Sequence, residues 1–494
     1  MEPQLYAAVL AGCVLLLIAV LAVRLADGAR LPVLLLYLGL GVALGEAGFG
    51  LRVTDDRITT DVGLVALALL LADGGLTTRW DRLRPALPHA VLLSTVGIAV
   101  SVAVVAAIAS LLPGVDLRTA LLLGAVVSST DAAAVFSVLR RLPVRAQVGA
   151  VLEAESGLND APTVVLVTLL ASRHWSSTSI WQVLGTVFAE LVGGLLVGLV
   201  VGRAGRELLA RAALPSAGLY PLATLGLVLL AWSAAGTLHA SGFLASYAGA
   251  AVLGNAHLPH RRAVLGFADS VALLAQAALF VLLGLLVSPA RLLPAVLPAL
   301  AVGAAATFLA RPLAVLVTAT PLRVPWREQA FLSWAGLRGA VPIVLATVAV
   351  RRGVPQAGRV LDVVFVLVVV YTLVQAPSLP WLGRRLGVVD PAAAHDLEVE
   401  VAPLDRTGTE LLEVGVPAGS RLHGVYVTEL RLPPGAHVAL VVRGAQTLVP
   451  DLFTQLLAQD SFLVVTTAKA RPATEQRLRA VGRDGKLAGW LVRP

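Results

Sequence analysis

The stretch Leu152–Leu170, LEAESGLNDAPTVVLVTLL, is apolar enough to cross a lipid bilayer, yet it carries Glu153, Glu155 and Asp160. An ionised carboxylate near the bilayer centre costs roughly 3 kcal/mol even on lenient insertion scales. Either a structural partner or a transported charge must offset that cost. The question for each acid is which of the two applies.

The composition of the whole chain places most of it in lipid. Of 494 residues, 57% are hydrophobic and 14% are charged, whereas soluble domains carry about 25% charged residues. A single cysteine, Cys13, excludes a disulfide framework and a cysteine-based metal site. The net charge of +8 comes from arginines in short loops between apolar runs. There they indicate membrane topology rather than nucleic-acid binding.

Apolar runs of the length that a transmembrane helix needs recur up to residue 380 and predict about thirteen spans. The positive-inside rule then places the N-terminus outside and the C-terminus in the cytoplasm. A composition rich in Ala, Val, Leu and Arg is typical of a bacterial chain, and we expect a multi-pass protein of the inner (plasma) membrane. The expected spans are 5–23, 31–47, 59–75, 87–112, 118–139, 148–171, 180–202, 217–237, 240–254, 264–287, 292–318, 329–350 and 360–380.

Two of these spans carry polar residues at their middle, which predicts interrupted helices. The span 118–139 contains Ser128, Ser129, Thr130 and Asp131. Hydroxyls compete for backbone hydrogen bonds, and half-helix ends can stabilise charge or coordinate an ion. The span 329–350 contains Arg338 beside a glycine and before a proline. The alternatives are a Ser/Thr helix-packing seam for the first and a snorkelling arginine for the second.

The opening stretch divides its acids between two faces. Ser156 and Asp160 are four residues apart and share a helix face, as Glu155 and Asn159 do. At about 100° per residue, Glu155 and Asp160 lie about 140° apart. We therefore expect Asp160 and Ser156 to face a cavity and bind a cation, while Glu155 pairs with Arg338. The alternative is that both acids are structural.

Four other ionisable residues in apolar runs are expected to be satisfied or interfacial. These are Asp73, Glu190, His239 and Asp269. The two interrupted spans lie about seven spans apart, which predicts internal inverted repeats with crossing helices near the midplane.

After residue 385 the chain becomes polar. We expect a transmembrane domain over residues 1–385, a linker over 386–408 and a small α/β domain over 409–494. Short β-type runs (ELLEVGV, AHVALVVRG, QTLVP and SFLVVTT) alternate there with turn residues. A closing helix is predicted at ATEQRLRAVGR. By the topology above, this domain lies in the cytoplasm.

Three motifs in register, SSTDAAAVFSVL, ESGLND and GLRGAVPIVLA, resemble those of the monovalent cation/proton antiporters in the sodium/proton exchanger superfamily. The resemblance covers residues 1–385. It implies a homodimer in which each protomer has a dimerisation part and a mobile core with two crossing discontinuous helices.

The resemblance also assigns roles to residues. It makes Asp160 the ion-binding and proton-exchanging carboxylate, with Ser156, Thr130 and Asp131 as companions in cation coordination or helix-end compensation. Asn159 matches the Asn-Asp pair of the electroneutral branch, and Glu155 is again paired with Arg338. The monovalent cation is expected at Asp160, Ser156 and Thr130. No cofactor is implied.

The C-terminal domain resembles the regulatory lobe called TrkA-C or RCK-C, found on potassium channels and transporters. It departs at Gln459–Asp460, where that family usually has Gly-Asp. A small regulatory ligand is an open possibility.

The expected function is exchange of K⁺, or alternatively Na⁺, for H⁺ at 1:1 stoichiometry, by alternating access with competition at Asp160. Two other classes are weighed. A cation channel would need a carbonyl filter loop, which the sequence lacks. An intramembrane enzyme would need a serine with a positioned histidine, and His239 has no acid nearby in the sequence.

Overall fold

The structure, a computed structural model, has two units, residues Met1–Val388 and Val389–Pro494. Each is described by itself. The structure describes residues 6, 12–13, 16–22, 24, 33–46, 48–50, 56–131, 142, 144–173, 175–256, 258–389, 399–404, 409–417, 420–444, 446–467, 469–486 and 488. Nine residues of the expected span 5–23, residues 132–139 of the span 118–139 and most of the linker 386–408 lie outside these residues.

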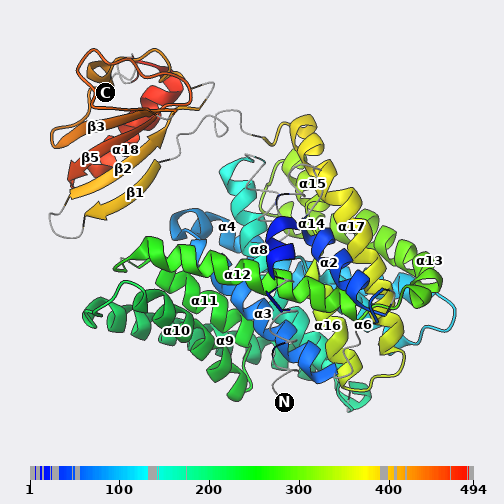
Figure 1. The fold of residues 1–494 in the computed structure, drawn as a ribbon. Coiled ribbons are helices and arrows are strands. Elements are labelled where there is room, and N and C mark those ends of the chain that lie inside the picture. Colours follow the sequence, from blue (N-terminus) through cyan, green and yellow to red (C-terminus); the bar gives the residue numbers. More distant parts are fainter. Residues whose placement is uncertain are drawn as a thin grey trace. The chain divides into compact units, whose positions relative to one another are not determined.

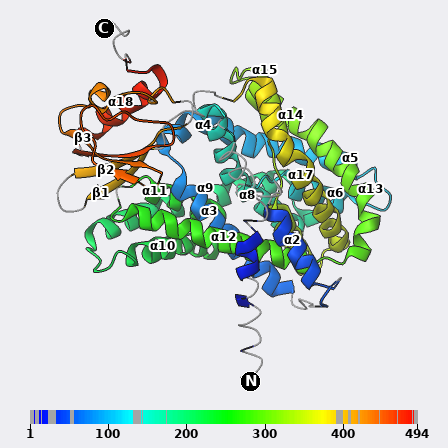
Figure 2. The same ribbon diagram turned by 45° about the horizontal axis from the view of Figure 1, so that its top comes forward.

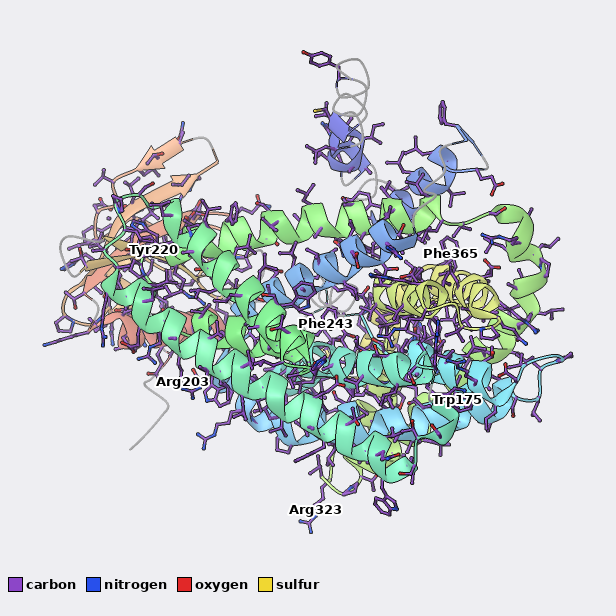
Figure 3. All side chains as sticks on the ribbon, turned by 90° about the horizontal axis from the view of Figure 1, so that it is seen from below. Trp175, Arg203, Tyr220, Phe243, Arg323 and Phe365 are labelled. Atoms are coloured by element: carbon purple, nitrogen blue, oxygen red, sulfur yellow. The ribbon has the colours of Figure 1, made fainter. Side chains whose placement is uncertain are left out.

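The first unit is helical. Among the described residues, seven helices are long and apolar enough to cross a membrane, and four shorter apolar helices accompany them. The membrane-type helical fold is confirmed, while the count of thirteen spans stays a prediction. Phe243 and Phe365 lie inside the unit and Arg323 projects from it (Figure 3).

The helices are divided here into two groups by their packing contacts, and their members can be followed by label in the two ribbon views (Figures 1 and 2). We call the first the α3 group. It consists of α2 (Val33–Leu44), α3 (Asp56–Thr77), α9 (Ile180–Arg211), α10 (Leu219–Thr237), α11 (Gly242–Gly254) and α12 (Arg261–Leu285). Glycines allow close packing within it: a Cβ at Gly254 would lie 2.2 Å from the Leu76 carbonyl oxygen.

The second group, the α8 group, contains the interrupted helices. Its members are α4 (Trp80–Leu92) with η1 (Leu93–Gly97) and α5 (Ile98–Ala109), α6 (Leu117–Ser128), α8 (Ala146–Leu170), α13 (Pro289–Ala305) with η3 (Ala306–Ala310) and α14 (Arg311–Ala319), α15 (Trp326–Trp334), α16 (Ala340–Arg351) and α17 (Ala357–Leu386).

The order of elements repeats within the α8 group. The continuous helix α4–η1–α5 has a π-helical turn at its middle, and so does α13–η3–α14. Each is followed by a helix that ends at a break, α6 or α15, and further on by a long helix, α8 or α17. Prolines within α4 and α13 precede both π-helical turns and weaken the regular hydrogen-bond ladder. This repeated order supports the predicted repeats, although no residue identity links the two halves.

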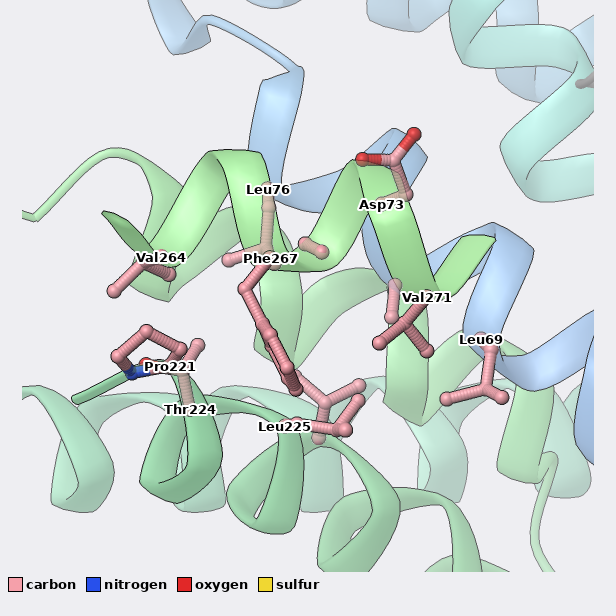
Figure 4. Close-up of a pocket in the computed structure, with 12 residues that line it drawn as sticks. Leu69, Asp73, Leu76, Pro221, Thr224, Leu225, Val264, Phe267 and Val271 are labelled. Atoms are coloured by element: carbon pink, nitrogen blue, oxygen red, sulfur yellow. The ribbon is translucent and has the colours of Figure 1, made fainter. Parts of the chain in front are cut away.

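A small apolar pocket lies between α3, α10 and α12, with a volume of about 10 Å³. Asp73 lies at its edge, and its carboxylate points away from the apolar floor formed by Leu225 and Phe267 (Figure 4). A space of this size holds at most about one water molecule. The pocket therefore reflects helix packing rather than a ligand site.

The second unit is a five-stranded antiparallel sheet with the order β1-β2-β5-β3-β4 and one helix, α18 (Arg471–Asp484). The expected β-type runs and closing helix are present. One strand was missed: β1 lies inside the segment expected to be a linker and pairs with β2. The strands are β1 (Val399–Leu404), β2 (Thr409–Gly415), β3 (Ala436–Arg443), β4 (Gln446–Leu448) and β5 (Ser461–Thr467).

Candidate functional site: two crossed helix breaks around a buried carboxylate

The first break follows α6. Ser129 has an extended backbone, with φ −67° and ψ 140°, so the helix ends at Ser128 in the middle of the expected span. The backbone N–H of Asp131 donates to the carbonyl of Leu337, 2.9 Å away. This bond joins the break after α6 to the break after α15. The two predicted interruptions are therefore in direct contact.

Asp131 lies at the first break, but its carboxylate compensates the N-terminus of the helix that follows the second break. Its Oδ2 accepts a hydrogen bond from the backbone N–H of Ala340, the first residue of α16, at 2.7 Å. Gly339 permits this approach, because a Cβ there would lie 1.8 Å from the same oxygen. A carboxylate at a helix N-terminus satisfies free N–H groups and complements the helix dipole.

Arg338 makes the reciprocal contact. Its Nε donates to the carbonyl of Val127, near the C-terminus of α6, at 2.6 Å, and its Nη1 donates to the carbonyl of Gly336 at 3.1 Å. The guanidinium lies over the ring of Tyr371, 4.7 Å from the centroid. A cation at a helix C-terminus is stabilised by the unpaired carbonyls there. The snorkelling alternative for Arg338 is excluded, since the side chain is buried.

The predicted pair of Glu155 with Arg338 is wrong. Glu155 instead binds Arg311, the first residue of α14, through two parallel hydrogen bonds, from Nη1 to Oε1 and from Nη2 to Oε2. Both side chains are buried. Helical spacing correctly placed Glu155 on a different face from Asp160, but spacing within one helix carries no information about which arginine meets that face.

Asp160 lies beside the first break. Its Oδ1 accepts a hydrogen bond from the hydroxyl of Ser129 at 2.7 Å. The hydroxyl oxygens of Thr130 and Ser156 lie 3.2 Å apart, and the side-chain amide of Asn159 donates to Thr130. All of these side chains are buried. The structure therefore brings together the predicted residues Asp160, Asn159, Ser156 and Thr130.

The carbonyl oxygen of the Asn159 side chain is buried and, within the part of the chain that the structure describes, has no hydrogen-bond partner. A buried polar atom without a partner costs about 1–3 kcal/mol. It lies on a residue bonded to Thr130 and adjacent in the chain to Asp160. A monovalent cation prefers such hard oxygen donors, and binding one would satisfy this atom.

Among the described buried acids of the membrane unit, one carboxylate has neither an ion pair nor a helix N-terminus to offset its charge. Glu155 is neutralised by Arg311, while Asp131 and Arg338 occupy oppositely charged helix ends. Among the described residues Asp160 has a hydroxyl partner and no ion pair in contact. Within the residues that the structure describes, no group of three or more His, Cys, Asp or Glu side chains could hold a metal ion. The arrangement can hold a single monovalent cation or a proton.

Three contributors to the site were not predicted, namely Ser129, Arg311 and Tyr371. Ser129 lies in the polar run that predicted the break. The signal for Arg311 was present in FLARPLAVL, where an arginine precedes a proline inside an apolar run. Like Arg338, Arg311 is a charged residue inside an apolar run and therefore needs a partner. Tyr371 carries no such signal, since an aromatic residue in an apolar helix is usually part of the core.

A helical membrane protein in which two helix breaks meet beside Asp160, a buried carboxylate with no ion pair among the described residues, has the architecture of an ion-coupled carrier. The comparisons with known proteins identify which kind. The family model described as "Sodium/hydrogen exchanger, transmembrane" matches residues 14–385. The chain belongs to the sodium/hydrogen exchanger family.

Relatives of known name cover nearly the whole chain. The K(+)/H(+) antiporter NhaP of Alkalimonas amylolytica is 36% identical over 460 residues, which are 92% of this chain and 80% of the relative. The K(+)/H(+) antiporter NhaP2 of a Shewanella species is 35% identical over 487 residues, covering 94% and 82%. The Na(+)/H(+) antiporter NhaS2 of a Synechocystis species is 25% identical over 390 residues, covering 77% and 71%.

A solved structure confirms the fold. The sodium proton antiporter MjNhaP1 from Methanocaldococcus jannaschii superimposes with a TM-score of 0.67 at 22% identity, covering 78% of this chain and 99% of that one. The protein is thus a secondary transporter of the cation/proton antiporter class and not an enzyme. The channel alternative is set aside with the enzyme.

Proposed function

We propose that the protein exchanges K⁺ for H⁺ across the bacterial plasma membrane, with Asp160 carrying either ion in turn. The observation that most directly supports this proposal is the Asp160 carboxylate. It is buried beside Ser129 at the break after α6, and among the described residues it has no ion pair. Burial favours the protonated form of a carboxyl and a bound cation favours the ionised form, so the two ions compete.

Thr130, Ser156 and Asn159 would supply the neutral oxygens. The unpaired side-chain oxygen of Asn159 supports a direct role as a ligand. Asp131 would act indirectly, by holding the N-terminus of α16 next to the site. Since one negative charge is uncompensated, one monovalent cation or one proton neutralises it, which supports 1:1 electroneutral exchange.

The choice of K⁺ rests on the two relatives named K(+)/H(+) antiporters, which are 36% and 35% identical. Na⁺ is the second candidate, because NhaS2 and MjNhaP1 are named for sodium at lower identity. Sodium and potassium sites both use hard oxygens, so the residue types at the site do not discriminate between them.

The test is proton flux in everted membrane vesicles after addition of K⁺ or Na⁺. Asp160→Asn is expected to abolish cation-dependent proton movement, whereas the matched Asp61→Asn, at an exposed acid of α3, leaves it unchanged. Undiminished exchange by Asp160→Asn would overturn the assignment. Rates that change strongly with an imposed membrane potential would refute electroneutrality, and a response to Na⁺ alone would refute K⁺.

We also propose a homodimer with the N-terminus outside and the C-terminal unit in the cytoplasm. That unit is proposed to be a regulatory lobe of the TrkA-C type, able to take a small ligand. Blue-native electrophoresis with cross-linking tests the dimer, and labelling of cysteines introduced at residues 258 and 444 from either side of the membrane tests the orientation.

A further inference from the structure

Gly157 lies on α8 between Ser156 and Asp160 along the chain, and an aromatic ring packs directly on it. A Cβ built at Gly157 would lie 2.5 Å from Cε2 and 2.7 Å from Cζ of Tyr247. Since real Cβ atoms essentially never approach other atoms within 3.0 Å, only glycine allows the ring of Tyr247 to lie here. Tyr247 is buried, with a relative exposure of 4%.

Tyr247 is held by the α3 group. Its hydroxyl lies 3.3 Å from the hydroxyl of Thr78, and the neighbouring Ser246 donates to the carbonyl of Ala68 at 3.1 Å. A Cβ at Gly75 would lie 2.6 Å from the carbonyl oxygen of Tyr247, so the backbones of α3 and α11 are in contact. The ring is therefore attached to the α3 group, whereas Gly157 belongs to the α8 group.

The ring covers a defined stripe of α8. At about 100° per residue, Glu153, Gly157 and Asp160 fall within an arc of about 60° on one face. Glu153 is half-buried and interacts electrostatically with Arg82 and with Tyr247. The stripe thus has the half-buried carboxylate of Glu153 nearest the N-terminal end of α8, then the covered glycine, then the buried Asp160.

We propose that Tyr247 is a gate: its ring, packed on Gly157, closes the route from Glu153 to Asp160, and it leaves Gly157 when the α8 group moves past the α3 group. The proposal rests on the proposed function, in which Asp160 is the exchange site, and adds to it a movement of the α8 group relative to the α3 group. Tyr247 is then a gating residue and does not bind the ion. The closing element is the ring rather than the hydroxyl, because the hydroxyl is bonded to Thr78 within the α3 group.

The experiment measures two quantities in the full-length protein, the exchange rate in proteoliposomes and the rate at which dicyclohexylcarbodiimide labels Asp160. Mass spectrometry of the peptide that contains Asp160 gives the second. Gly157→Ala displaces the ring and Tyr247→Leu removes it. Each is expected to raise labelling and to lower exchange by about tenfold, because the closed state no longer forms.

The double variant Gly157→Ala with Tyr247→Leu is expected to return both quantities to within about threefold of the unmodified protein, since the added methyl fills part of the space that the ring leaves. Tyr247→Phe keeps the ring and is expected to match the unmodified protein. Gly149→Ala is the control on the same helix, because its nearest contact, Val144 Cγ2, would lie at an ordinary 3.4 Å.

Unchanged labelling in Gly157→Ala, or single effects that simply multiply in the double variant, would overturn the gate. If Gly157→Ala does not accumulate, the comparison of Tyr247→Leu with Tyr247→Phe decides: equal labelling overturns the proposal, and faster labelling of the leucine variant supports it. Labelling reports access to Asp160 whether or not Asp160 carries the exchange. A failure of the proposed function therefore appears separately, as exchange that persists in Asp160→Asn.

Discussion

Replacing Arg311 by methionine is expected to destabilise the membrane unit by about 3–5 kcal/mol, because it leaves the Glu155 carboxylate buried without its partner. The side chains of Arg311 and Glu155 are 6% and 3% exposed. Water therefore cannot replace the two hydrogen bonds that the guanidinium provides. The carbonyl of Leu332, which accepts from Arg311 Nε at 3.3 Å, loses a donor as well.

The pair of Arg145 with Glu328 is the matched control. It joins residues of the same two types at 2.9 Å, but Arg145 is 54% exposed. Exposed pairs contribute about 0–1 kcal/mol, so Arg145→Met is expected to change stability by no more than that. Unfolding free energies are measured by titrating SDS into mixed detergent micelles and following the loss of helix by circular dichroism.

A double-mutant cycle tests the assignment of the partner. The cycle of Glu155→Gln with Arg311→Met is expected to give a coupling free energy of about 2–3 kcal/mol, because the double variant leaves no buried charge unpaired. The cycle of Glu155→Gln with Arg338→Met is expected to give about 1 kcal/mol or less. A larger coupling with Arg338 than with Arg311 would refute the pairing and restore the one predicted from helical spacing.

Three further outcomes are expected. Asn159→Asp adds a second acid beside Asp160 and is expected to make exchange sensitive to an imposed membrane potential in proteoliposomes. An exchange rate that does not respond to the potential would argue against inferring the stoichiometry from the number of charges at the site. Asp131→Asn is expected to lower stability by about 1–3 kcal/mol on SDS titration, through its weaker bond to the N-terminus of α16. In the C-terminal unit, burial raises the pKa of Asp460, but hydrogen bonds from Arg443 and the Leu457 backbone outweigh it and hold that pKa below its usual value. The ionised Asp460 carboxylate therefore stabilises the folded C-terminal unit above the unfolded-state pKa of about 3.9. This stabilisation is lost as the pH falls through the folded-state pKa. Protection of β5 peptides from hydrogen exchange in the full chain, taken relative to the intrinsic exchange rate at each pH, should fall at low pH, and Asp460→Asn should abolish the part of that fall which this carboxyl causes.

The predictions that succeeded depend on short stretches of sequence. The breaks after α6 and α15 follow from hydroxyls, glycine, proline and charge within a few residues of Asp131 and Arg338. The strands β2 to β5 follow from β-branched runs between turn residues. β1 was missed because its sequence, VEVAPL, has a proline and two acidic neighbours nearby and pairs at the edge of the sheet.

The failed prediction concerned a contact between helices. Helical spacing gives the angle at which Glu155 leaves α8, and two arginines, Arg311 and Arg338, lie at comparable depth in other helices. Which of them meets Glu155 depends on how α14 and the α15–α16 break pack against α8. That packing is set by side chains spread over several helices, and no local pattern records it.

The same dependence on packing between helices explains why the roles of Asp131 and Arg338 could not be assigned from their own motifs. Asp131 and Arg338 each sit in one break and compensate the helix end at the other, so each break is incomplete without its counterpart. Asp131, expected to act in cation coordination or helix-end compensation, and Arg338, expected to pair with Glu155, are thereby both used at helix ends. With Glu155 also neutralised, Asp160 remains as the buried acid that we propose to carry the exchanged ion. Loss of either cap should thus disturb the position of Asp160 through the crossing, even though neither Asp131 nor Arg338 needs to touch the ion.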